Sequence, residues 1–334
     1  MSVNPSVATG ASAAVSVPLK DDFFNVRVVK KEAVAQGIYL FELRHFDGAP
    51  LPTFTPGSHL TVQVPSGVRR NYSLCSDPAD TGMYQIAVKR DEAGRGGSIS
   101  MADDVQVGQL LSVSWPRNNF ELVERANNFI FVAGGIGITP ILSMMRHLKN
   151  TGQGEFKLYY CTRDEAGTAF IDHIKSEFSG QVQIHHDNGD MAQALDLWPV
   201  FEKPGNAHVY CCGPKGLMDS VDDMSGHWPS GSVHFESFGV DAKAFAEDKP
   251  FDVRLAKTGT TVHVGADQTI LEALRGAGVR VPSSCESGTC GSCKTRLLAG
   301  EVERRDMVLI EEEKQDYIMV CVSRAKSDEL VLDL

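Results

Sequence analysis

Four cysteines near the C-terminus have the residue type and spacing to hold a redox cofactor. Cys285, Cys290 and Cys293 form a C-x4-C-x2-C run, and Cys321 follows later in the chain. This is the ligand spacing of a plant-type [2Fe–2S] cluster, which carries one electron at low potential. A zinc site pairs C-x2-C with a second close pair, which this sequence lacks, and a disulfide framework is typical of secreted chains. The cysteines therefore predict a one-electron carrier.

The segments around these cysteines suit a cluster. The loop that holds the first three is rich in Gly and Ser, so its backbone N–H groups can point at the sulfurs. We expect Tyr317–Val322 to form the strand that brings Cys321 to the same place.

Composition limits the classes of protein to which the chain can belong. With 334 residues, 42% of them hydrophobic, it should hold two or three domains. The net charge of −11 argues against nucleic acid as a partner, and no apolar run reaches the roughly 18 residues of a membrane span. Residues 1–20 lack a signal-peptide pattern and are expected to be a flexible tail. We expect a cytoplasmic monomer, in which Cys75, Cys161 and Cys211 are ordinary thiols.

The pattern of apolar residues changes twice along the chain. In 21–120, short alternating runs separated by turn residues predict an antiparallel β-barrel. In 121–238, strands alternate with helices, which predicts a doubly wound α/β domain with a parallel sheet. Residues 239–250 have the composition of a linker, and 251–334 form a smaller β-rich unit that contains the cluster cysteines.

Two motifs fall at strand ends in the expected α/β domain. Gly135-x-Gly137-x-x-Pro140 lies where a strand opens into a helix, a place where the backbone can approach a pyrophosphate. A glycine turn that serves only packing is the alternative. Cys212 directly follows another strand and would lie at the same edge of the sheet, either beside a ligand or simply buried before a turn.

Two motifs in the expected barrel could bind a phosphorylated ring. Arg70, Tyr72 and Ser73 share one strand, where Arg can hold a phosphate, Tyr can cover a ring and Ser can offer a hydroxyl. An ordinary strand with one surface arginine is the alternative. Gly94–Ser98 precedes a short helix and can form a phosphate cradle, or else a flexible hairpin turn.

Together, these motifs resemble those of the ferredoxin–NADP reductase superfamily. The four that carry the resemblance are, in order, Arg70-x-Tyr72-Ser73, Gly96-Gly97-Ser98, Gly135-x-Gly137-x-x-Pro140 and Cys212-Gly213-Pro214. With the cluster cysteines last and His234–Phe238 before the linker, the chain is similar to the phthalate dioxygenase reductase family. The resemblance extends from Phe23 to Leu334.

This resemblance implies three cofactor sites. It implies FMN on the barrel (FAD is the alternative), NADH on the parallel sheet, and a [2Fe–2S] cluster in an α+β, β-grasp-like ferredoxin domain. Carried over by motif, the flavin residues are Arg70, Tyr72 and Ser73, with Arg95, Gly97 and Ser98 at its phosphate and Phe235 over its ring. The nucleotide residues are Gly135, Gly137, Thr139 and Cys212, the last near the nicotinamide, and Ser73, Cys212 and Phe235 would be closest to hydride transfer. The cluster ligands are Cys285, Cys290, Cys293 and Cys321, of which Cys285 would be nearest the flavin.

The choice between NADH and NADPH is open from the residues alone. Asp164 would bond ribose hydroxyls and repel a 2′-phosphate, whereas the adjacent Arg163 would attract one. The resemblance favours NADH.

The predicted function is a reductase that passes electrons from NADH through FMN and the cluster to a Rieske-type oxygenase that acts on aromatic acids. One alternative is a non-Rieske acceptor, either a hydroxylase or a cytochrome. Another is a redox-sensing iron–sulfur protein, which would need no hydride site. The acidic run Glu311–Glu313 is expected to be a solvated face, with a partner-docking patch as the alternative.

Overall fold

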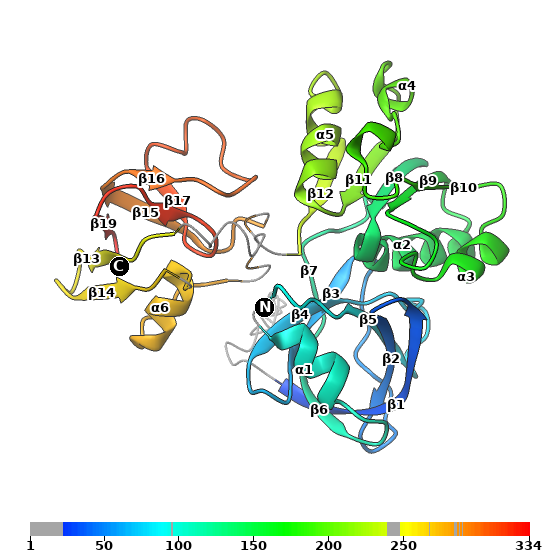
Figure 1. Ribbon diagram of the computed structural model, residues 1–334, viewed down its shortest axis with the longest axis horizontal. Helices are drawn as coiled ribbons and strands as arrows, with labels where there is room; N and C mark the ends of the chain where they lie inside the picture. Colours follow the sequence, from blue (N-terminus) through cyan, green and yellow to red (C-terminus); the bar gives the residue numbers. More distant parts are fainter. Residues whose placement is uncertain are drawn as a thin grey trace, which may run out of the picture.

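The computed structural model describes residues 23–94, 96–238, 248–266, 268–283, 286, 288 and 290–334. Three sheets lie within these ranges, and each belongs to a separate part of the sequence (Figure 1). The predicted tail 1–20, Arg95, Cys285 and most of the predicted linker 239–250 fall outside the described residues.

The first sheet is an antiparallel barrel. Its strands run in the order β4-β3-β6-β1-β2-β5, and the short β7 pairs with β3. The bridge between Leu74 and Ile86 joins the two ends of this order and closes the sheet. Alternate side chains point inward, so that Leu60, Val62 and Ile86 are fully buried. The elements are β1 (Phe23–Ala35), β2 (Ile38–His45), β3 (Ser58–Gln63), β4 (Arg69–Ser73), β5 (Tyr84–Lys89), α1 (Gly97–Asp104), β6 (Leu110–Ser114) and β7 (Arg117–Asn118).

The second sheet is fully parallel, in the order β10-β9-β8-β11-β12. The helices α2 and α3 cover one face, and α4 and α5 cover the other. Because the strand order reverses between β8 and β11, the carboxyl ends of these two strands form the switch point at which such sheets bind ligands. The elements are β8 (Asn128–Gly134), a 3-10 turn (Gly135–Gly137), α2 (Ile138–Thr151), β9 (Glu155–Thr162), α3 (Ile171–Glu177), β10 (Val182–His186), a 3-10 turn (Met191–Gln193), α4 (Trp198–Phe201), β11 (His208–Cys212), α5 (Lys215–Ser225) and β12 (Val233–Glu236).

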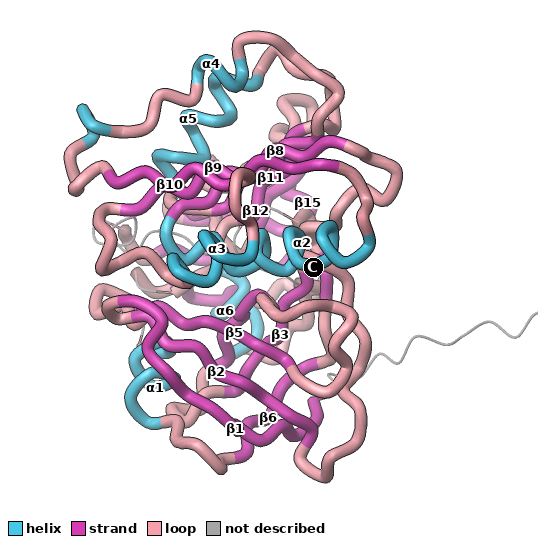
Figure 2. The backbone as a smooth tube through the Cα atoms, turned by 90° about the vertical axis from the view of Figure 1, so that its right-hand side faces the viewer, coloured by secondary structure: helices cyan, strands magenta, loops and turns pink. Residues whose placement is uncertain are grey.

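The barrel and the parallel sheet share one apolar core. Figure 2 shows α2 and α3 between the two sheets. Cys75 and Ala87 of the barrel belong to the same buried cluster as Met144 and Met145 of α2. The flavin-type and nucleotide-type domains are therefore packed together through α2, rather than joined only by the chain.

The third sheet is mixed and has its own core. Its order is β14-β13-β19-β15-β17, in which only β13 and β19 are parallel, and a small β16–β18 pair lies beside it. Thr269 begins α6 with a capping box in which Glu272 bonds back to its backbone. The elements are β13 (Phe251–Leu255), β14 (Thr261–Val264), α6 (Ile270–Gly276), β15 (Lys294–Ala299), β16 (Val302–Glu303), β17 (Tyr317–Met319), β18 (Arg324–Ala325) and β19 (Glu329–Leu332).

One predicted element is shorter than expected. The strand predicted at Tyr317–Val322 ends at Met319, and Cys321 lies in the turn that follows. None of the helices in the described part of the chain is both long and apolar enough to cross a membrane.

A half-buried histidine pair makes stability depend on pH. His234 stacks on Tyr210 and lies with its Nε2 3.1 Å from Nδ1 of His208. Burial, together with the neighbouring His208, lowers the pKa of His234 from 6.5 to about 4. Since the unfolded chain then binds the proton more readily than the folded one, stability is intact above about pH 6.5 and falls as the pH drops toward 4.

We therefore expect the melting temperature to decrease between pH 7 and 4, and to decrease less in His234→Gln. Calorimetry over that range measures the effect, with the exposed His227→Gln as the control. Equal slopes for the wild type and His234→Gln would show that the pair does not cause it.

Candidate functional site

The carboxyl ends of three parallel strands meet at one edge of the second sheet. Gly134 ends β8, and Cys212 ends β11 opposite Ala133. Glu236 ends β12 directly opposite Cys212. Residues paired in a parallel ladder point to the same face, so the Cys212 thiol and the Glu236 carboxylate share the face that looks toward the barrel.

The predicted glycine motif lies at this edge and is tightly built. A Cβ on Gly137 would lie 2.1 Å from the carbonyl oxygen of Cys212, so the two turns touch through their backbones. Gly135 has a φ of 52° and nothing within 4 Å of a built Cβ, which leaves its backbone open to a ligand. The Thr139 hydroxyl donates to the Ile136 carbonyl at 3.0 Å and holds the turn in shape. This open turn at the start of α2 fits a pyrophosphate.

Asp164 follows β9 at the same edge. One oxygen of its carboxylate accepts the Gly167 N–H at 2.7 Å, and its carbonyl accepts the Thr168 hydroxyl at 2.7 Å. The residue therefore shapes its own turn, and its second carboxylate oxygen is the one available for a ribose hydroxyl.

The barrel meets this edge at the end of β4. Ser73 is only 5% exposed, and its hydroxyl donates to the Glu236 carboxylate over 3.5 Å. The hydroxyl of the adjacent Tyr72 is buried and has no hydrogen-bond partner among the described residues. Burial raises the pKa of Tyr72, so the phenol stays protonated and can donate. A buried hydroxyl without a partner beside Ser73 fits a bound ring with polar edges.

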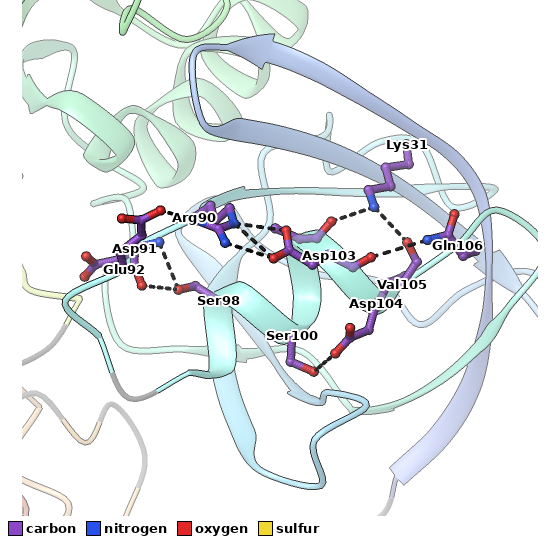
Figure 3. Close-up of polar contacts among 11 residues, drawn as sticks. Lys31, Arg90, Asp91, Glu92, Ser98, Ser100, Asp103, Asp104, Val105 and Gln106 are labelled. Carbon is purple, nitrogen blue, oxygen red and sulfur yellow. Dashed lines mark hydrogen bonds and ion pairs between the residues drawn. The ribbon is translucent and has the colours of Figure 1, made fainter.

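Arg70 lies against the amino-terminal end of α1. A Cβ on Gly97 would lie 2.6 Å from the Arg70 Nε, so only glycine lets the guanidinium approach this end of the helix. The other end is fixed by Lys31, which donates to the carbonyls of Ala102 and Val105 (Figure 3). A guanidinium beside a helix amino terminus fits a phosphate.

The Ser98 hydroxyl, predicted at the flavin phosphate, forms a hydrogen bond within the protein. Its hydroxyl accepts the Asp91 N–H at 3.2 Å and also lies 3.5 Å from the Asp91 carbonyl (Figure 3). It therefore closes the loop that contains the predicted cradle, and direct contact with a phosphate would require the hydroxyl to leave this bond. Arg95, the other predicted phosphate residue, lies outside the described residues.

Cys212 is a neutral thiol in this environment. It is fully buried, and burial, the Glu236 carboxylate and Cys211 all raise its pKa well above 9. Whatever lies against Cys212 therefore meets an uncharged, polarizable group rather than a nucleophile.

The structure contradicts the prediction for Phe235. Phe235 pairs with Cys211, not Cys212, and packs with Val132 and Trp228 on the face of the sheet that α4 and α5 cover. Because neighbours along a strand point to opposite faces, Phe235 points away from the barrel and cannot cover a ring bound there. Phe238, two residues beyond the strand, is 47% exposed.

Sequence reasoning also missed Glu236. Glu236 is 8% exposed, and its carboxylate accepts the Ser73 hydroxyl at 3.5 Å. It pairs with Cys212 in the ladder, and its charge raises the pKa of that thiol. The available signal was its place at the end of the last apolar strand of the domain, since parallel strands end at one edge.

Arg146 links the parallel-sheet side of this site to the barrel side. It stands on α2, and its guanidinium donates to the Cys75 carbonyl at 2.6 Å and to the Gln85 Oε1 at 3.0 Å. Cys75 is two residues beyond Ser73. The helix that begins at the glycine turn is thus tied to the strand that ends at Ser73, and the tie sets the spacing between the two binding surfaces.

We expect Arg146→Gln to slow hydride transfer from NADH about tenfold, because misplacements near 1 Å cost up to ~10²-fold. The dissociation constant for NADH should stay within about twofold, since no nucleotide contact is removed. Anaerobic stopped-flow absorbance measures both quantities. Lys149→Gln is the matched control, because Lys149 lies on the same helix and pairs with Glu177 as Arg146 does, but its other contact is with Phe178 rather than with the barrel. Unchanged hydride transfer in Arg146→Gln would contradict this role.

Two of the predicted cluster cysteines, Cys293 and Cys321, lie at the same end of the third sheet. Cys293 directly precedes β15 and Cys321 lies two residues beyond β17. Lys294 pairs with Met319 in the antiparallel ladder, so the two cysteines leave the sheet at the same end. Both are 2% exposed, whereas Cys290, three residues before Cys293, is partly exposed.

Three described residues of the segment around Cys290 have a positive φ. They are Glu286, Gly288 and Gly291, and this conformation can turn a backbone N–H group toward an anion. Among the described residues no group of three His, Cys, Asp or Glu side chains is placed to hold a metal ion, and Cys285, the predicted fourth ligand, lies outside them. The assignment of the four cysteines to a [2Fe–2S] cluster therefore rests on their spacing in the sequence.

Comparison with known proteins matches all three parts of the chain. Residues 25–122 match the family model of an oxidoreductase FAD-binding domain, 131–223 an oxidoreductase NAD-binding domain, and 253–326 a 2Fe-2S iron-sulfur cluster binding domain. The chain is 60% identical over 321 residues to a phthalate 4,5-dioxygenase oxygenase reductase subunit of Pseudomonas putida, covering 96% of this chain and 99% of that protein. It is 58% identical over 322 residues to phthalate dioxygenase reductase of Burkholderia cepacia, covering 96% and 100%.

A solved structure of phthalate dioxygenase reductase, described as a modular structure for electron transfer from pyridine nucleotides to [2Fe–2S], matches the fold with a TM-score of 0.82. The identity is 58%, over 94% of this chain and 98% of that one. The predicted fold class and the predicted cofactor classes are thereby confirmed. The chain belongs to the phthalate dioxygenase reductase family and is an NADH-dependent flavin and [2Fe–2S] reductase of an oxygenase system.

Proposed function

We propose that this chain delivers electrons from NADH to the Rieske-type oxygenase of a phthalate dioxygenase-like system. The observation that carries the proposal is the contact between Ser73 and Glu236. It brings the end of the flavin-type strand β4 to the ligand-binding edge of the nucleotide-type sheet, so that a ring on one side can stack on a ring on the other.

The flavin supplies the conversion of a two-electron hydride into single electrons for the cluster. The residues of this chain supply position. Gly135, Gly137 and Thr139 would hold the nucleotide, with Asp164 at its ribose. Ser73 and Tyr72 would hold the ring edge, while the neutral Cys212 and the Glu236 carboxylate would border the nicotinamide. Cys285, Cys290, Cys293 and Cys321 would bind the cluster.

We infer FMN as the flavin. Arg70 beside Gly97 fits a doubly charged phosphate monoester at the amino-terminal end of α1, and Arg95 and Ser98 are the nearby residues in sequence that we propose for the same phosphate. A ribose contact from Asp164, whose carboxylate would repel a 2′-phosphate, supports NADH over NADPH. The domain units that we propose remain 21–120, 121–238 and 251–334.

Phe238 is the residue that we now propose for covering the flavin ring. Phe238→Ala should raise the flavin dissociation constant about tenfold, because it removes an aromatic contact, and leave the melting temperature of the flavin-free protein within about 2 °C. Phe235→Ala should lower the melting temperature and leave the flavin dissociation constant unchanged, since its side chain packs in a core. Flavin fluorescence titration and calorimetry measure the pair. Loss of flavin binding in Phe235→Ala alone would contradict the assignment.

The partner is tested by cross-reduction. The NADH-reduced chain should reduce the oxygenase component of the Pseudomonas putida phthalate system faster than a diiron hydroxylase or a cytochrome P450. A preference for either of the latter would replace the proposed acceptor. We expect a transient complex of a monomeric, cytoplasmic reductase that contacts neither membrane nor nucleic acid.

A further inference from the structure

The segment 306–312, here called the cover segment, lies directly on the cluster loop. It belongs to the connection between β16 and β17 at the top of the third sheet (Figure 1). The Met307 N–H donates to the Gly288 carbonyl at 3.0 Å, and a Cβ on Gly288 would lie 3.2 Å from the Asp306 Cα. A Cβ on Gly291 would lie 3.8 Å from Val308. The segment therefore touches the loop on both sides of Cys290.

The cover segment is held rigidly at its base. Leu309 is 7% exposed and belongs to the core of the third sheet. The Asp306 carboxylate accepts the Leu309 N–H at 3.1 Å and the Ser323 hydroxyl at 3.4 Å. The preceding Arg305 forms a nearly buried ion pair with Asp248. A surface built in this way loses little entropy when a partner binds.

Two large apolar side chains of this rigid segment face outward. Met307 is 40% exposed and Ile310 is 61% exposed, and these values are for the whole chain with the barrel and the parallel sheet in place. Neither of those domains therefore covers them. Leu309 and Val308 already anchor the segment, so the fold does not need Met307 and Ile310 at the surface.

The apolar pair is bordered by negative charge. Residues 306–316 contain six charged side chains, of which only Lys314 is basic. Glu311 and Glu312 are exposed next to Ile310. Glu313 is paired with Lys294 at 2.8 Å and Glu311 with Lys314, so Glu312 is the exposed carboxylate beside Ile310 that has no ion pair with another described residue.

We propose that the cover segment is the docking surface for the oxygenase component, with Met307 and Ile310 as its apolar anchors and Glu311 and Glu312 as its charged rim. The proposal rests on the proposed function. Electron transfer weakens steeply with distance, so the acceptor must bind next to the cluster loop. The cover segment contacts that loop, is anchored by Leu309 and exposes Met307 and Ile310. The complementary face is an apolar patch bordered by Lys or Arg.

A docking surface of this kind suits a brief redox encounter. Interfaces for such encounters are small. The methionine side chain is flexible and can adapt to a partner, and opposite charges accelerate the encounter. One electron moves in the docked complex, so that the cluster is oxidised and the acceptor is reduced, and no bond forms or breaks.

The test is electron transfer to the oxygenase component of the Pseudomonas putida phthalate system, at varied oxygenase concentration and saturating NADH. Ile310→Ala and Met307→Ala should each raise the oxygenase concentration for half-maximal rate about tenfold, as expected for a buried anchor. Ferricyanide reduction, the NADH-reduced EPR signal of the cluster and the melting temperature should not change. Leu298→Ala is the matched control, because Leu298 is 48% exposed on β15 of the same domain.

A charge variant tests the rim independently. Glu312→Gln should reduce the dependence of the oxygenase reaction on salt, because one screened attraction is removed. An unchanged oxygenase reaction in both apolar variants would overturn the proposal. So would slower NADH-driven reduction of the cluster in these variants, which would identify the chain's own flavin domain as the occupant. Loss of a dimer in sedimentation would likewise identify a second copy.

Failure of the proposed function and failure of the docking proposal give different results. If the unaltered chain reduces ferricyanide but not the oxygenase, the proposed function is wrong and the docking proposal falls with it. If the unaltered chain and its apolar variants reduce the oxygenase equally well, only the docking proposal is wrong.

Discussion

Cys290→Ser should leave reduction of the flavin by NADH unchanged and abolish electron delivery to the oxygenase component. Serine is a poor ligand for iron, so the cluster should be lost or altered. The rate of hydride transfer should not change, because Ser73, Cys212 and Glu236 lie in the other two domains. Anaerobic stopped-flow absorbance follows flavin reduction, and oxygenase reduction should fall to the level of a protein without a cluster.

Cys211→Ala is the control for loss of a thiol. Cys211 is also buried, but it packs with Val132 and Phe201 in the core below α4 and α5. Its removal should lower stability slightly and leave electron delivery intact. Full electron delivery by Cys290→Ser would mean that electrons leave the flavin by another route.

Gly137→Ala should slow hydride transfer by about 10²-fold. The added methyl would lie 2.1 Å from the Cys212 carbonyl oxygen and 2.9 Å from the Gly213 nitrogen. Both are backbone atoms, so the turn must move as a whole, and a displacement near 1 Å costs roughly this factor. Overpacking should also destabilise the fold by about 1–3 kcal/mol. Stopped-flow reduction by NADH and calorimetry measure the two effects.

Gly216→Ala is the control for adding a methyl group nearby. Gly216 lies in the first turn of α5, and a Cβ there meets nothing within 4 Å. This change should be neutral or stabilise the helix by up to about 1 kcal/mol, with hydride transfer unchanged. If Gly137→Ala behaved like Gly216→Ala, the contact between the two turns would not matter for hydride transfer.

The parts of the site that depend on local patterns were predictable from the sequence. The spacing of Cys285, Cys290, Cys293 and Cys321 requires no knowledge of the fold to indicate a cluster. The glycines at 135 and 137 lie between an apolar strand and a helix, and that local order places them at a sheet edge. The alternation of short runs before residue 120 was likewise enough to predict an antiparallel barrel.

The errors arose where strand register decides. Phe235 and Glu236 are neighbours, and only the pairing of β12 with β11 shows that Glu236 accompanies Cys212 while Phe235 faces the opposite core. Sequence periodicity cannot distinguish these two faces, because both are buried. The bond between Ser98 and Asp91 was invisible for a similar reason, since it depends on how a loop folds back on itself. The β17 strand was overestimated because the apolar run continues past Met319 into a buried turn.

The most direct test of electron flow through this chain is low-temperature EPR of the pure protein after anaerobic reduction with NADH. The account predicts a rhombic signal whose average g value lies below that of the free electron, because electrons from NADH reach a [2Fe–2S] cluster through the flavin. The same signal with dithionite but not with NADH would contradict the route, and the absence of a signal with both would contradict the cluster itself.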